Sequence, residues 1–166
     1  MISEINRRAH LIGVIYWTDG ERMPLDVFSY IREASRSFQF GCFLGAITLA
    51  SCAVETILNQ DSRTKSGKWM YLDPKTLRKA HTAGLPVQAL LSPDESMNKG
   101  IPVFVRRRNE TAHGNVSDVI RTLSDYDPDA ESAALDQLGK ASRFICDWFN
   151  SSPDVQQKRI KNNAWP

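Results

Sequence analysis

The 166 residues have the length of one ordinary globular domain, and a chain of this size can bury roughly two thirds of the surface that it exposes when unfolded. Apolar residues make up 42% of the sequence and charged residues 24%, which excludes a disordered tail protein, a collagen-like chain and a small scaffold that needs disulfides. With 21 basic and 19 acidic side chains, a nucleic-acid role must depend on a local cluster of charge rather than on the net charge.

The three cysteines and the longest apolar run near the start indicate the cellular compartment in which we expect the protein. Cys42, Cys52 and Cys146 are an odd number without CxxC spacing, so they predict neither a disulfide framework nor a zinc site. Their apolar neighbours predict small buried side chains in a reduced, cytoplasmic protein. The run from Leu11 to Trp17 is too short to span a bilayer and lacks a cleavage site, so we expect no membrane segment and no signal peptide.

Two helices are predicted in the first part of the chain, after a start that the pattern leaves open. The run from Leu11 to Trp17 fits either a short strand or a helical turn. Pro24 opens the first predicted helix, in which apolar residues recur with a period of 3.6 as far as Phe38. A second helix is predicted from about Cys42 to Gln60. It is rich in small residues, which let a neighbouring helix approach closely, so we expect it at the centre of the fold.

Glu55 lies beside the apolar stripe of this second helix rather than opposite it. A carboxylate inside a bundle needs a partner, because burying an unpaired charge is costly. The alternative is that Glu55 lies at the edge of the bundle and reaches water. The sequence alone leaves both interpretations open.

A loop and a third helix are predicted next. The stretch 61–71 is polar and predicts the loop. Asp73 is a residue type preferred at an N-cap, and Pro74 suits the first helical turn. Gly84 marks the end of this helix, because glycine readily adopts the left-handed conformation that closes many helices.

The rest of the chain is also predicted to be helical. Ser92 and Glu95 have the spacing of a capping box, which predicts a short helix that ends at Gly100. Pro102 opens the next helix, which continues to about Ala112. A long helix follows over about 129–150, opened by the Asp-Pro pair before it.

These elements define the expected fold class. No alternating run bounded by hairpin signals is present, so the class is all-α. Short connections between amphipathic helices favour an antiparallel bundle of four to five main helices with short accessory helices. We expect a single domain over residues 1–166, with its core at about 25–150 and peripheral ends at 1–24 and 151–166.

One segment carries residue types suited to chemistry: Arg106, Arg107 and Arg108, followed by Asn109 and then by His113. Arginine presents a fork of donors that matches phosphate oxygens, and histidine exchanges a proton near neutral pH. Together they suit RNA cleavage by the ribose 2′-hydroxyl, which needs a base, an acid and a cation but no metal ion. The plainer interpretation is that the arginines complement the helix dipole and that the histidine caps the helix end.

The spacing of these residues sets a geometric condition. On a straight helix Asn109 and His113 share a face with Arg106, whereas Arg108 lies about 140° around the axis from His113. Arg108 and His113 meet within one chain only if the helix ends or bends between them, and Gly114 is consistent with an early end. A two-fold axis would instead bring the arginine of one chain to the histidine of another.

The segment 108–114, Arg-Asn-Glu-Thr-Ala-His-Gly, resembles the signature of the HEPN superfamily: an arginine, a polar residue beside it, and a histidine four to six residues after the arginine. The helix at 45–58 resembles the small-residue helix of that family, which ends in an Ala-x-Glu-x-x-Leu pattern. The resemblance covers about residues 25–60 and 101–149. It does not cover the first 24 residues, the insert at 61–100 or the tail after Asn150.

The resemblance implies a bundle of four to five helices that pairs as a homodimer, with both motifs facing one cleft. It implies a metal-independent ribonuclease without a cofactor, from a toxin–antitoxin, anti-phage or RNA-processing system, with RNA and an antitoxin or other protein as partners. Arg108 would then bind the scissile phosphate, and His113 would be the general acid or base. Asn109 would orient one of the two, and Glu55 would anchor the site from the neighbouring helix.

Two further groups of residues have weaker signals. Arg106 and Arg107 lie outside the strict motif. The resemblance implies for them no more than contacts with the RNA backbone. A mixture of basic and aromatic residues over 65–79 predicts either an RNA-facing edge with stacking platforms or a solvated surface: Lys65, Lys68, Trp69, Tyr71, Lys75, Arg78 and Lys79. His10 and His81 have no companions at ligand spacing, so no metal is expected.

Two other functions remain open from the sequence. The first is a non-catalytic HEPN-like module that dimerises or binds nucleotides or RNA, with Arg108 holding a phosphate or a partner carboxylate. The second is a purely structural helical protein in which Arg108 and His113 serve only as internal hydrogen-bond partners.

Overall fold

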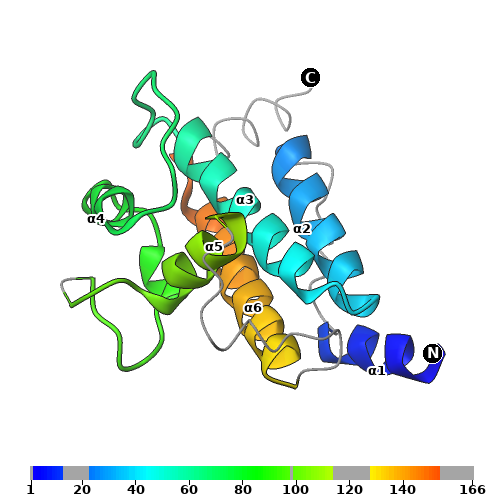
Figure 1. Ribbon diagram of the computed structural model, residues 1–166. Helices are drawn as coiled ribbons and strands as arrows, with labels where there is room; N and C mark the ends of the chain where they lie inside the picture. The colour runs from blue at the N-terminus through cyan, green and yellow to red at the C-terminus, as the bar shows by residue number, and fades with distance from the viewer. Residues whose placement is uncertain (1, 13–22, 98, 114–127, 154–166) are drawn as a thin grey trace, which may run out of the picture.

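The computed structural model describes residues 2–12, 23–97, 99–113 and 128–153 (Figure 1). These residues form six α-helices and one short 3-10 helix, and their single strand-like feature is an isolated bridge between Ser96 and Lys99. The predicted all-α helical bundle is therefore confirmed. The helices in chain order are α1 (Ile2–Ile12), α2 (Leu25–Gln39), α3 (Phe43–Gln60), α4 (Pro74–Thr82), η1 (Val87–Leu90), α5 (Val103–His113) and α6 (Pro128–Ser151).

Helix α3 lies at the centre of the fold, as its small residues predict. It packs against α2, α5 and α6 (Figure 1), and Ala46, Ala50 and Ala53 on it are fully buried. Among the described helices, α3 is the one that is long and apolar enough to cross a membrane, but most of it is buried inside the protein. Its apolar character is therefore that of a core helix.

A tight turn makes α2 and α3 antiparallel neighbours. Gly41 in this turn has a φ of +80°, a left-handed conformation that glycine adopts at little cost. The amide of Cys42 donates to the carbonyl of Ser37 at 2.8 Å and closes the end of α2. Across the turn the rings of Phe38 and Phe43 pack with their centroids 5.7 Å apart.

The buried apolar side chains form one cluster to which every described helix contributes. Burying one large apolar side chain contributes about 1.5–3 kcal/mol, so this cluster is the main source of stability. The largest fully buried apolar side chains include Ile31 and Phe38 on α2, Ile47, Ile57 and Leu58 on α3, Phe104 on α5, and Leu138, Phe144 and Ile145 on α6.

The helix predicted after the 61–71 loop is α4, and its ends are as predicted. The Asp73 carboxylate accepts a hydrogen bond from the Thr76 amide at 2.6 Å and so caps the helix, with Pro74 as its first residue. Gly84, just after the helix, has a φ of +81°. These boundaries therefore agree with the capping signals in the sequence.

The short helix predicted between Ser92 and Gly100 is wrong, because the described residues there form turns. Glu95 Oε2 does accept the Ser92 amide at 2.7 Å, as in a capping box. Its Oε1 accepts the Val103 amide at 2.6 Å, so Glu95 caps the start of α5 instead of opening a helix of its own. Burial alone would raise the pKa of Glu95, but these backbone hydrogen bonds outweigh it and lower the pKa.

Two other predictions concern the burial of the cysteines and the conformation of the apolar run 11–17. Cys42 is exposed and Cys52 and Cys146 are half-buried, so the prediction of three buried cysteines is wrong. Cys42 lies in the turn before α3, where the chain is at the surface. The start of the chain is helical as α1, but most of the apolar run 11–17 lies outside the described residues, so the choice between strand and turn is not decided there.

Candidate functional site

Helix α5 is held firmly against its neighbours at its first turn. Phe104 and Val105 are fully buried. The side-chain amide of Gln137 on α6 donates to the Phe104 carbonyl and to the Ser51 hydroxyl on α3, both at 3.0 Å. Because this one buried side chain joins three helices, the side chains that follow on α5 project from a fixed base.

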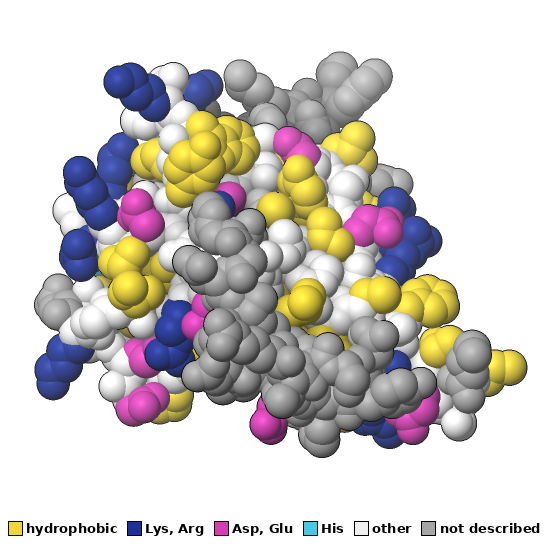
Figure 2. All heavy atoms as spheres, viewed as in Figure 1, with side chains coloured by type: hydrophobic (Ala, Val, Ile, Leu, Met, Phe, Trp, Pro, Cys, Tyr) yellow, Lys and Arg dark blue, Asp and Glu magenta, His cyan; other side chains and the backbone are white. Residues whose placement is uncertain are grey.

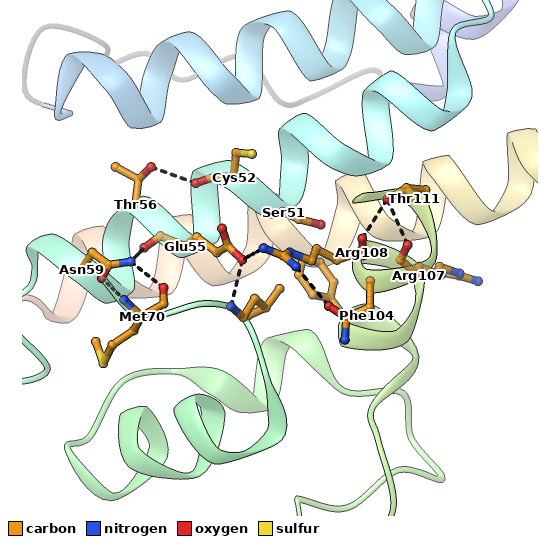
Figure 3. A network of polar contacts seen from close by, with 12 residues as sticks. Ser51, Cys52, Glu55, Thr56, Asn59, Met70, Phe104, Arg107, Arg108 and Thr111 are labelled. Atoms are coloured by element: carbon orange, nitrogen blue, oxygen red, sulfur yellow. Dashed lines mark hydrogen bonds and ion pairs between the residues drawn. The ribbon is translucent and has the colours of Figure 1, made fainter. Parts of the chain in front are cut away.

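Arg108 on α5 forms an ion pair with Glu55 on α3, with 2.7 Å between Nη2 and Oε1 (Figure 3). The side chains are only 12% and 8% exposed, respectively, so the pair is largely removed from water. The same carboxylate oxygen accepts the Leu72 amide at 2.8 Å. Glu55 therefore has partners inside the protein, and the alternative in which it reaches water at the bundle edge is wrong.

Two further side chains contact the Arg108 guanidinium. Nη1 donates to Oδ1 of Asn109 at 3.1 Å, and the guanidinium carbon lies 5.8 Å from the ring centroid of Tyr71. An arginine over an aromatic ring gains a cation–π interaction. The structure thus brings together three residues that the sequence nominated, Glu55, Arg108 and Asn109, and adds Tyr71.

Arg106 and Arg107 point elsewhere. Arg107 Nη1 lies 2.5 Å from Oδ2 of Asp136 on α6, and Lys140 lies 3.0 Å from the same oxygen. Burial would raise the pKa of Asp136, but the bonds from Arg107 and Lys140 outweigh it and lower the pKa. Arg106 is exposed. In Figure 3 the Arg107 side chain extends away from Glu55. Arg107 and Arg108, although consecutive, therefore contact different helices, α6 and α3.

His113 is the last residue of α5, and the helix is continuous from Arg108 to it. The helix therefore does not end between the two residues, which removes one of the two ways for them to meet within a chain. The His113 side chain and Gly114 lie outside the described part of the structure. The arrangement across a two-fold axis stays a prediction.

A residue that the sequence reading missed is Asn59, one turn after Glu55 on α3. Its Nδ2 donates to the Met70 carbonyl at 2.8 Å, and its Oδ1 accepts the Met70 amide at 2.7 Å. Together with the bond from the Leu72 amide to Glu55, this fastens the 69–72 segment onto α3 (Figure 3). The i,i+4 spacing of two polar residues on an otherwise apolar helix was the available signal.

The chemistry open to this site is recognition of an anion by an oriented guanidinium. Arg108 is fixed by Glu55 and Asn109, so its donors are presented in one geometry instead of many. No group of three or more His, Cys, Asp or Glu side chains that could hold a metal ion occurs in the portion of the chain that the structure describes.

Comparison of the chain with protein-family models, with curated proteins and with solved structures finds no match. The HEPN resemblance therefore rests on the two sequence motifs alone.

Proposed function

We propose that this protein is a metal-independent endoribonuclease of the HEPN type that cleaves RNA in a cleft shared by two copies of the chain. The observation that carries the proposal is the ion pair between Arg108 and Glu55. It joins the helices that bear the two motifs, and Asn109 contacts the same guanidinium. A phosphate-binding arginine anchored by the glutamate of the small-residue helix is the arrangement that the resemblance implies.

In the proposed reaction the ribose 2′-oxygen attacks the adjacent phosphorus and the 5′-oxygen of the next nucleotide leaves. His113 removes the 2′-hydroxyl proton, and the His113 of the second copy protonates the leaving oxygen. The products are a 2′,3′-cyclic phosphate and a 5′-hydroxyl. Acid–base assistance of this kind contributes on the order of 10²–10⁴ to the rate.

Arg108 donates hydrogen bonds to the phosphate oxygens as negative charge builds on them. Glu55 balances its charge, so the guanidinium acts mainly as an oriented donor and less as a net positive charge. Such a donor needs no reorganisation during the reaction, which is why removing one oriented donor typically costs on the order of 10²–10³ in rate. Asn109 holds the guanidinium in that orientation.

The test is cleavage of labelled single-stranded RNAs of varied sequence by the purified protein in excess chelator. Wild type is expected to cleave and to leave 2′,3′-cyclic phosphate ends, and His113→Ala is expected to lose on the order of 10²–10⁴ in rate. Arg36→Ala is the matched control, because this exposed arginine lies on α2 and pairs with Glu33. If wild type and His113→Ala are equally inactive on every RNA, the enzymatic proposal is wrong.

A second candidate function is a non-catalytic HEPN-like module that dimerises or binds RNA or nucleotides. The same ion pair favours it, since a largely buried carboxylate at 2.7 Å already neutralises Arg108. This candidate predicts RNA or nucleotide binding without turnover, weakened by Arg108→Lys because lysine lacks the bidentate fork. Binding by equilibrium dialysis together with product analysis separates the two candidates.

The proposed setting is cytoplasmic, in a toxin–antitoxin or anti-phage system. The partners in that setting are RNA, a second copy of this chain, and an antitoxin or other protein that restrains the activity. Expression of wild type beside His113→Ala in a bacterial host tests it: wild type is expected to arrest growth. Equal growth of the two strains at equal protein levels would contradict a toxin role.

A further inference from the structure

The segment just before α4 exposes two large aromatic side chains, Trp69 and Tyr71, which are separated by one residue in the sequence. Trp69 is 59% exposed and Tyr71 is 63% exposed, whereas Leu72 is 1% exposed. Leaving two such rings in water forgoes the stabilisation that burying them would give. Trp and Tyr are enriched at binding interfaces, because each has a large apolar ring and a polar group that can stay in contact with water.

The backbone that carries these rings is fixed. Asn59 forms two hydrogen bonds with the backbone of Met70, and Glu55 accepts the amide of Leu72. The backbone groups of alternate residues are thus bound to α3, while Trp69 and Tyr71 stay exposed. Because this backbone is already ordered, a ligand that stacks on the rings does not have to order the chain that carries them, and binding costs less entropy.

The surroundings of the rings are basic. Five exposed cations lie on the loop and on α4: Lys65, Lys68, Lys75, Arg78 and Lys79. None of the five forms an ion pair with a described residue. Figure 2 shows Lys and Arg side chains along the edge of the molecule where this loop and α4 lie, next to a group of hydrophobic side chains.

The two acidic residues of the same stretch are already engaged. Asp61 is buried and bonds to Arg63 and Trp148, and Asp73 caps α4. The surface around Trp69 and Tyr71 therefore presents positive charge and flat apolar rings together. This combination complements a polyanion with exposed bases, and it does not complement an apolar protein surface.

The rings also adjoin the candidate site. The guanidinium carbon of Arg108 lies 5.8 Å from the centroid of the Tyr71 ring. From these observations we propose that Trp69 and Tyr71 form a stacking platform for unpaired bases of single-stranded RNA, which places the neighbouring phosphate at Arg108. The bases of a duplex stack on one another and cannot stack on these rings, so the ligand is single-stranded. This inference rests on the proposed ribonuclease function and names its substrate class.

The test uses the full chain and a fluorescent single-stranded 2′-O-methyl oligonucleotide, which has no attacking hydroxyl and so separates binding from cleavage. Fluorescence anisotropy is measured for wild type, Trp69→Ala and Trp69→Phe. Loss of one stacked ring is expected to weaken binding about 5- to 150-fold, and Trp69→Phe is expected to retain most of it. The control is Phe40→Ala, because Phe40 is 66% exposed at the α2–α3 turn, away from α4 (Figure 1).

Three outcomes would overturn the platform. The first is equal affinity of wild type and Trp69→Ala while both have the same melting temperature. The second is binding of a matched duplex as tight as that of the single strand. The third is a change of oligomeric state in Trp69→Ala with unchanged RNA affinity, which would make the surface a protein interface.

The platform and the ribonuclease proposal fail in different ways. If wild type binds the oligonucleotide through Trp69 but cleaves no RNA, the stacking platform is supported, the ribonuclease proposal is wrong, and the protein is a binding module. If wild type cleaves RNA and Trp69→Ala cleaves it with unchanged KM, the ribonuclease proposal is supported and the stacking platform is wrong.

Discussion

The Glu55 carboxylate and the Arg108 guanidinium are 2.7 Å apart, and this ion pair directly links α3 and α5. A second bond from the Leu72 amide to Glu55 ties the segment before α4 to the same point. One largely buried carboxylate thus positions the candidate phosphate-binding residue and the backbone that carries the exposed rings. Structure and proposed function depend on the same side chain.

The first prediction concerns that carboxylate. Glu55→Gln keeps the size of the side chain but removes the charge opposite Arg108, and leaving one partner of a buried pair unbalanced costs about 3 kcal/mol. Unfolding in urea is expected to show this loss, whereas Glu33→Gln, at an exposed pair on α2, is expected to change stability by less than about 0.5 kcal/mol. Equal effects of the two substitutions would show that the Glu55–Arg108 pair contributes nothing specific.

This pair also changes what a stability measurement can decide. Truncating Arg108 destabilises the protein whether it acts on RNA or not, because Glu55 then loses its buried partner. Stability therefore does not separate a catalytic Arg108 from a structural one. His113→Ala is the informative substitution: in the enzymatic account it removes activity and leaves the unfolding free energy nearly unchanged.

The second prediction concerns Glu95 as the cap of α5. Glu95→Ala removes the acceptor of the Ser92 and Val103 amides and is expected to cost about 1 kcal/mol, the usual value of a helix cap. Asp94→Ala is the matched control, because this neighbouring carboxylate is exposed. Chemical unfolding of both variants measures the difference. If Asp94→Ala costs as much as Glu95→Ala, the capping role is wrong.

The third prediction is a pH dependence at Asp61. Burial would raise the pKa of Asp61, but hydrogen bonds from Arg63 and Trp148 outweigh it, and the pKa falls below its ordinary value of 3.8. The folded state therefore binds this proton more weakly than the unfolded state. The resulting stability is fully present above about pH 4 and is lost as the pH falls through the lowered pKa.

The measurement for this prediction is the unfolding free energy of wild type and Asp61→Asn between pH 7 and pH 2. The advantage of wild type is expected to shrink as the solution becomes more acidic. A constant or growing difference toward low pH would show that the Asp61 carboxylate is not stabilised in its charged form.

The fourth prediction concerns the attachment of the 69–72 segment. Asn59→Ala removes both bonds to the Met70 backbone, so the Met70 amide is expected to exchange with solvent deuterium faster than in wild type. Gln60→Ala serves as control, because Gln60 bonds to Asp26 on α2 instead. Unchanged protection in Asn59→Ala would mean that other contacts hold the segment.

Much of the fold follows from local rules that the sequence displays. The Asp73 cap, the position of Gly84 and the small residues of α3 predict their elements correctly, because each depends on neighbours within a turn or two. Glu95 misled the prediction for the opposite reason. Its spacing from Ser92 is local, but its second oxygen bonds to Val103, and nothing in the local pattern indicates that contact.

In the candidate site, too, some features follow from the local sequence and others depend on long-range contacts. Asn109 directly follows Arg108 in the sequence, and the position of Glu55 beside the apolar stripe of α3 left open whether it has a partner inside the bundle or reaches water. Which cation it finds is set by how α5 crosses α3, and only the resemblance linked the two in advance. Tyr71 and Asn59 were not nominated for this site, because their contacts depend on the path of a loop with no periodic pattern.

The central claim is that Arg108 and His113 from two copies of the chain act in one cleft on RNA. The most direct measurement is RNA cleavage in excess chelator by wild-type chains refolded with increasing amounts of His113→Ala chains, compared with the same amounts of Arg36→Ala chains. The account predicts that mixed dimers of wild type and His113→Ala are nearly inactive, because the shared cleft then holds one histidine where the reaction needs two, so activity falls more steeply than the fraction of wild-type chains. Confirmed mixed dimers that keep half of the wild-type activity would contradict it, because each histidine would then act within its own chain.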